Sequence, residues 1–154
     1  MPLIEKHWPA QVAAPPAIWL QLDHFVHSLC EIEGDNLIGV YLHGSLAMGC
    51  FAIRHSDVDL LVLVDQPPSP QRRREWAQQV LPASHAPGPI EISFLHRDQY
   101  TPWRHPAPFS FHFSEGWRAR ISRELLAGSW TGWNWDATPD PDLAAHFTVT
   151  RRRG

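Results

Sequence analysis

The stretch Val40–Val64, VYLHGSLAMGCFAIRHSDVDLLVLV, decides how the rest of this 154-residue chain is interpreted. One apolar run leads into Gly44-Ser45, and a second apolar run begins with Asp57 and Asp59. Residues two apart in a strand point to the same face, so both carboxylates are expected side by side. Two like charges there need a counter-charge, and a divalent metal ion is the obvious one. The Gly-Ser turn would offer backbone N–H groups and a hydroxyl to a phosphate.

Each half of this pattern also occurs without such a role. Gly-Ser is common in ordinary turns, and Asp-x-Asp often marks a solvated strand end. The two together, on consecutive strands, are much more specific.

Composition limits the class of protein. The length suits one domain with a core, and 44% hydrophobic with 19% charged residues is typical of a globular protein. The net charge of −3 and the shortness of the runs Arg72–Arg74 and Arg151–Arg153 argue against a nucleic-acid partner. Two cysteines and the absence of a leader or a long apolar run predict a cytoplasmic protein without a membrane segment.

The first half of the chain predicts alternating helices and strands. Residues 1–16 are rich in proline and predict an extended lead-in. A helix is expected from Ala17 to Gly34, with its apolar face formed by Ile18, Leu22, Phe25, Val26, Leu29 and Ile32. Strands are expected at 36–42 and 57–64, joined by a short helix at 45–51, and a second long helix at 71–81 would turn Trp76 and Val80 inward.

A third strand is predicted at Ile90–Leu95, where apolar residues alternate with Glu91 and Ser93. Glu91 is by default the polar side of an amphipathic strand. If this strand neighbours the one that starts with Asp57, Glu91 adds the third carboxylate that two-metal phosphoryl chemistry needs.

The second half is harder to assign. TPWRHPAPFSFHF (101–113) predicts no regular element, and the tryptophan-rich WTGWNWDATPD (130–140) is expected to be a loop packed on the core. A helix capped by Ser114 is expected to run to Gly128, and a last helix would start at Asp140.

The order helix, strand, Gly-Ser, strand, helix, strand, with three acids, resembles the DNA polymerase β-like nucleotidyltransferase superfamily. The resemblance implies a single α+β (α/β) domain over residues 1–154, with a small mixed sheet backed by helices. The later blocks DLLVLV, IEISFL, PWRHP, SEGW and DPDLAAHFTVTRRRG are similar to those of the aminoglycoside adenylyltransferases that modify streptomycin and spectinomycin.

The resemblance implies an ATP-dependent transfer of AMP to a hydroxyl of an aminoglycoside-like small molecule, with Mg²⁺ as cofactor. Three groups of residues would carry it. Those that would hold the nucleotide are Gly44, Ser45 and Ser56; those that would bind metal or act as base are Asp57, Asp59 and Glu91; those that would line the drug pocket are Glu115 and Trp117.

Two departures keep other hypotheses open. Gly116 separates Glu115 from Trp117, which are adjacent in the family, and the chain stops at Gly154 where the family continues into a helical domain. A homodimer or a separate helical partner protein is therefore expected to complete the site. The alternatives are a minimal, antitoxin-like nucleotidyltransferase that modifies a partner protein, or a nucleotide-binding module without turnover. The three intact acids favour an enzyme, and the late sequence blocks favour the small-molecule acceptor.

Overall fold

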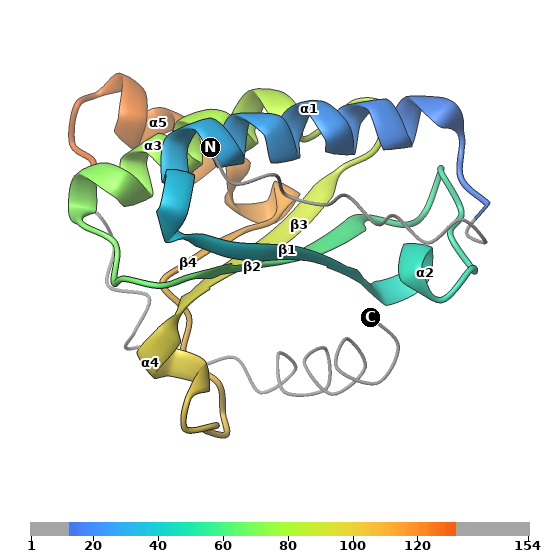
Figure 1. Ribbon diagram of the computed structural model, residues 1–154. Helices are drawn as coiled ribbons and strands as arrows, with labels where there is room; N and C mark the ends of the chain where they lie inside the picture. The colour runs from blue at the N-terminus through green and yellow to red at the C-terminus, as the bar shows by residue number, and fades with distance from the viewer. Residues whose placement is uncertain (1–12, 132–154) are drawn as a thin grey trace.

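A computed structural model describes residues 13–131, which form a four-stranded sheet with two long helices packed on one face (Figure 1). The strands are β1 (Leu37–His43), β2 (Val58–Val64), β3 (Ile90–His96) and β4 (Phe111–Phe113). They lie in the order β1-β2-β3-β4, with β2 and β3 parallel and both outer pairs antiparallel. The expected mixed sheet backed by helices is thus confirmed.

The helices α1 (Pro16–Glu33) and α3 (Pro70–Ala83) match the predicted ranges closely. Proline stands in the first turn of each, where its missing N–H costs nothing. Gly34, with a φ of 53°, follows the last residue of α1. At the start of α3, the Ser69 hydroxyl accepts a hydrogen bond from the Arg72 N–H (3.1 Å).

An aromatic cluster lies in the core between the helices and the sheet. Trp76 of α3 stacks on Phe94 of β3, with ring centroids 4.2 Å apart, and meets Phe111 of β4 edge-on. Because side chains alternate across a strand, this contact also shows which residues face the other way. Glu91 and Ser93 on β3, and His112 on β4, lie on the sheet face opposite α1 and α3.

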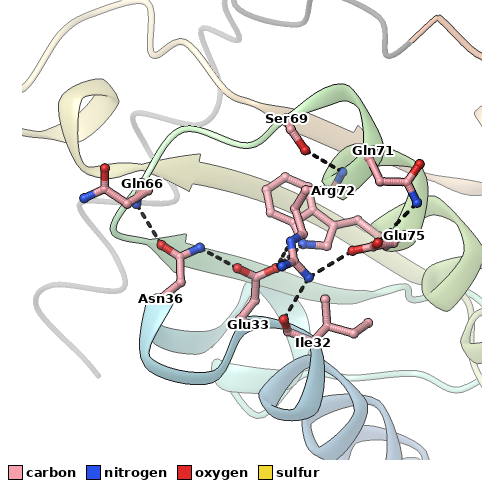
Figure 2. A network of polar contacts seen from close by, with 9 residues as sticks. Ile32, Glu33, Asn36, Gln66, Ser69, Gln71, Arg72 and Glu75 are labelled. Atoms are coloured by element: carbon pink, nitrogen blue, oxygen red, sulfur yellow. Dashed lines mark hydrogen bonds and ion pairs between the residues drawn. The ribbon is translucent and has the colours of Figure 1, made fainter.

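A polar network ties the end of α1 to α3 (Figure 2). The buried carboxylate of Glu33 accepts hydrogen bonds from the Trp76 indole (2.7 Å) and the Asn36 amide (2.5 Å), and Arg72 lies 3.4 Å from it. Arg72 also donates to the Ile32 carbonyl at 2.8 Å. A charge this deeply buried is tolerated because it is paired and hydrogen-bonded on both oxygens.

Several expectations about the connections were wrong. The helix after the first strand, α2 (Gly44–Ala47), is one turn long and ends well before Phe51, with Gly49 in a left-handed conformation (φ 75°) soon after it. The segment 101–113, expected to be irregular, contains β4, and a one-turn helix α4 (Arg97–Tyr100) precedes it. Ser114 makes no side-chain cap, and the helix it precedes is divided into η2 (Glu115–Trp117) and α5 (Arg118–Leu126).

Some expectations cannot be compared with the structure. The lead-in, apart from its last four residues, most of the tryptophan-rich loop and the last helix lie outside residues 13–131. The single-domain boundary over 1–154 therefore stays a prediction. None of the helices within the described residues combines the length and the apolar character needed to cross a membrane.

Candidate functional site

The predicted acids meet at one edge of the sheet because β2 and β3 are paired strands. Asp59 lies directly opposite Glu91 in the parallel register, and Asp57 directly precedes β2. The sequence predicted that Glu91 would join the two aspartates only if its strand lies next to the Asp-x-Asp strand. The pairing of β2 with β3 confirms that condition. Figure 1 shows α2, which begins at Gly44, at the end of β1 beside this edge.

The Gly-Ser turn is packed against Asp59 itself. Gly44 has a φ of 63°, and a Cβ placed on it would lie 1.9 Å from Oδ2 of Asp59 and 2.6 Å from its Cγ. The backbone N–H of Ser45 donates a hydrogen bond to the same carboxylate. Glycine is therefore required at position 44 both for its backbone conformation and for the close approach of Asp59.

Burial and repulsion together disfavour a negative charge on Asp59. The pKa of Asp59 is raised from 3.8 to about 7, first by burial, then by the charges of Glu91 and Asp57. The Ser45 N–H acts in the opposite direction and stabilises the carboxylate. The three acids are thus close enough to repel one another, and a bound cation would relieve that repulsion.

The donor set suits a hard divalent cation. Carboxylate oxygens are the ligands that Mg²⁺ prefers, and Asp57, Asp59 and Glu91 supply them from two adjacent strands. Among residues 13–131, no group of three or more His, Cys, Asp or Glu side chains already has the spacing of a metal site. Oxygen atoms from a bound ligand, such as a triphosphate, would therefore have to complete the coordination of the ion.

Ser56, a predicted nucleotide contact, helps to close the loop before β2. Its hydroxyl accepts a hydrogen bond from the Ala52 N–H (3.1 Å), and its own N–H donates to the Ala52 carbonyl (2.8 Å). These bonds shape the turn that delivers Asp57 to the sheet edge. The role of Ser56 toward a nucleotide stays a prediction.

Glu115, a predicted drug contact, is already paired within the chain. Its carboxylate receives two hydrogen bonds from the Arg118 guanidinium (2.6 and 2.9 Å) and one from the Ser84 hydroxyl (2.5 Å). Arg118 holds the pKa of Glu115 below its usual range. The Ser84 hydroxyl also accepts the N–H of Ile90, so Glu115 lies at the same end of β3 as Glu91.

Trp117 lies partly buried against the core, with the Arg120 guanidinium 5.7 Å from its ring centroid. It is anchored at the same η2 segment as Glu115. Direct contact of either residue with a drug stays a prediction.

Two histidines beside the carboxylates were missed. His43 lies opposite Asp59 in the β1–β2 register and is buried. His112 lies beside Glu91, with its Nε2 atom 3.9 Å from Oε1. The alternation Phe-His-Phe at 111–113 could have placed His112 on the polar face, had the segment been recognised as a strand.

A groove of about 460 Å³ lies away from the acids. It runs between α1 and the C-terminal end of α3, and Leu20, Phe25, Pro82 and Pro87 are among its lining residues. Those helices cover the sheet face opposite Glu91. The groove is therefore separate from the cluster of carboxylates.

The part of the chain that matches a known protein family lies within the described residues. Residues 22–95 match the nucleotidyltransferase domain family, a span that includes Gly44, Ser45, Asp57, Asp59 and Glu91. Spectinomycin 9-adenylyltransferase of Staphylococcus aureus strain N315 is 27% identical over 128 residues, which cover 79% of this chain and 46% of the relative. Aminoglycoside (3'') (9) adenylyltransferase of Klebsiella pneumoniae is 34% identical over 121 residues, which cover 75% and 43%.

A solved structure shows the same fold. Spectinomycin adenyltransferase AAD(9) from Enterococcus faecalis, crystallised with ATP and spectinomycin, superposes with a TM-score of 0.60 and 26% identity. The match covers 68% of this chain and 44% of that one. The chain thus spans less than half the length of these relatives.

Proposed function

We propose that the protein transfers AMP from ATP to a hydroxyl group of an aminoglycoside-like small molecule. The match of residues 22–95 to the nucleotidyltransferase domain family supports this reaction. The observation that carries the proposal is the meeting of Gly44-Ser45, Asp57, Asp59 and Glu91 at one sheet edge. The acceptor class is supported by the relatives, which are spectinomycin and aminoglycoside adenylyltransferases.

Asp57 and Asp59 would hold Mg²⁺, with Glu91 available to a second ion. The metal would offset the negative charge of the triphosphate. The Ser45 N–H and the close packing of Gly44 hold the Asp59 carboxylate in place for this task. Binding of the cation would reverse the electrostatic effect that raises the pKa of Asp59, because it favours the ionised form.

Glu91 would act as the base toward the acceptor. Its side chain is 40% exposed, so a hydroxyl group arriving from solvent can reach it. Glu91 takes the hydroxyl proton as the oxygen forms a bond to the α-phosphorus of ATP. The bond from that phosphorus to the β-phosphate oxygen breaks, and pyrophosphate leaves with the electron pair.

A transfer assay with the full chain tests this proposal. The protein is incubated with ATP labelled at the α-phosphate, Mg²⁺, and a panel that includes streptomycin and spectinomycin. We expect label on one of these drugs, and loss of that label with Asp57→Asn. Label found only on a co-purified protein would refute the proposal that the acceptor is a small molecule. ATP binding without any transfer of label would refute the proposal that the protein is an enzyme.

The oligomeric state belongs to the same test. We propose that a second copy of the chain or a helical partner protein contributes to the acceptor site. Light scattering with and without substrate measures this. A strict monomer that transfers AMP at full rate would refute a shared site.

A further inference from the structure

His112 stands on the sheet beside the proposed base. It lies on β4 between Phe111 and Phe113, whose side chains are fully buried under the helices. Its own side chain therefore points to the opposite face, which carries Glu91. Because β4 pairs with β3, His112 is the direct cross-strand partner of Ser93 and the diagonal neighbour of Glu91.

The imidazole ring is held at one end and faces Glu91 at the other. Its Nδ1 atom lies 3.0 Å from the buried Ser93 hydroxyl, and its Nε2 atom lies 3.9 Å from Oε1 of Glu91. The Phe109 ring packs beside it, with centroids 5.7 Å apart. The His112 side chain is only 14% exposed, so its orientation is set by these neighbours rather than by solvent.

We propose that His112 is a positioning residue for Glu91, which it holds at the sheet edge through an Nε2–H donor that Ser93 orients. The inference rests on the proposed function, because it gives Glu91 a task that depends on its position. A carboxylate can only accept a hydrogen bond, so the proton belongs on Nε2, and Nδ1 then accepts the Ser93 O–H. The 3.9 Å separation closes to a hydrogen bond in the substrate complex, as such contacts in ligand-free enzymes often do.

The contact with His112 would counteract an electrostatic repulsion that acts on Glu91. Asp59 lies directly opposite Glu91, and the charge of Glu91 is the second cause, after burial, of the raised pKa of Asp59. The two carboxylates therefore repel each other when no cation lies between them. A hydrogen-bond donor on the other side of the glutamate counteracts that repulsion and helps to keep the carboxylate at the sheet edge. His112 is the group on the other side of Glu91, across β4.

Kinetics of four variants test the proposal. We expect His112→Leu to lower kcat about tenfold, with KM for ATP changed less than about twofold, because orientation rather than nucleotide binding is lost. Ser93→Ala should show a weaker loss of the same kind. His112→Gln keeps an N–H donor and should recover most of kcat. His27→Gln, on the exposed face of α1, is the matched control and should behave as wild type.

Wild-type kcat in His112→Leu would overturn the proposal, and so would a failure of His112→Gln to recover kcat. A rise in KM for ATP as large as the fall in kcat would also overturn it. Unfolding in urea identifies any variant whose loss comes from instability, and for such a variant the resonance measurement below decides.

A second measurement does not depend on turnover. Nitrogen-edited NMR detects the Nε2 proton of His112 in the full chain with Mg²⁺ and ATP bound. We expect this resonance to be lost in Glu91→Ala and kept in Asp35→Asn, at an exposed acid in η1 (Gly34–Asn36), the short 3-10 helix that follows α1. If no drug accepts AMP, the proposed function fails but this measurement still decides the inference. Persistence of the resonance in Glu91→Ala would overturn it.

Discussion

Replacing Asp59 with asparagine is expected to stabilise the metal-free protein at pH 8 while abolishing AMP transfer. Asparagine removes one of three neighbouring negative charges and still offers an oxygen to the Ser45 N–H. The carboxylate that the proposed reaction needs is therefore expected to destabilise the protein in the absence of metal. Such an exchange of stability for function is common at active sites.

The sign follows from the raised pKa of Asp59. Between 3.8, the ordinary value, and about 7, the native state holds a proton that the unfolded chain has lost. The stability of the wild type therefore falls as pH rises through this window, and the slope ends above about pH 7. Asp59→Asn lacks this contribution, so its advantage over wild type should grow from pH 5 to pH 8.

The magnitude can be bounded. From pH 5 to about pH 7 the native state keeps a proton that the unfolded chain has lost. Each of these roughly two pH units corresponds to about 1.36 kcal/mol, which sets a ceiling of about 2.7 kcal/mol. Partial solvent access screens the interaction, so we expect a change of about 1 kcal/mol. For a chain of this size that is a shift in Tm of about 2–4 °C.

Urea unfolding at pH 5 and pH 8 in the presence of EDTA measures the difference between variant and wild type. Asp35→Asn, at an exposed acid away from the sheet edge, is the control for the loss of one acidic side chain elsewhere and is measured under the same conditions. If Asp59→Asn is destabilised equally at both pH values, the repulsion inferred from the three acids is wrong.

Three further predictions concern the same site and its scaffold. Mg²⁺ should raise the Tm of the wild type more at pH 8 than at pH 6, because protons compete with the ion for Asp59. It should leave the Tm of Asp59→Asn unchanged. Equal shifts of the wild-type Tm at both pH values would contradict a metal site that includes Asp59. Gly44→Ala should lower the rate of AMP transfer at least about 100-fold, because its Cβ would collide with Asp59. Gly49 has a similar φ but open space around it, so Gly49→Ala should show only the backbone cost of about 1–2 kcal/mol in urea unfolding. Trp76→Phe keeps the stack on Phe94 but removes the donor to buried Glu33, and should cost about 1.5–3 kcal/mol in urea unfolding; a loss below about 0.5 kcal/mol would show that Glu33 does not need the indole.

Local sequence patterns were enough to predict the long helices, the third strand and the candidate site residues. Proline at the start and glycine after the end bounded α1, and spacings of three and four residues identified its buried face. Alternation predicted β3 and placed Glu91 and Ser93 on one face. These features depend on neighbouring residues only, so periodicity and turn chemistry are enough to recognise them.

How these elements meet depends on contacts between distant parts of the chain. The parallel pairing of β2 with β3 sets Asp59 opposite Glu91, although they are far apart in the chain. The same packing showed that Gly44 must be glycine because Asp59 lies against it, and that Arg118 already pairs with Glu115. β4 escaped prediction because it is three residues long in a proline-rich segment and is stabilised by pairing with β3 rather than by its own pattern. His112 therefore came into view only with the fold, since its place beside Glu91 depends on contacts between strands that no local pattern contains.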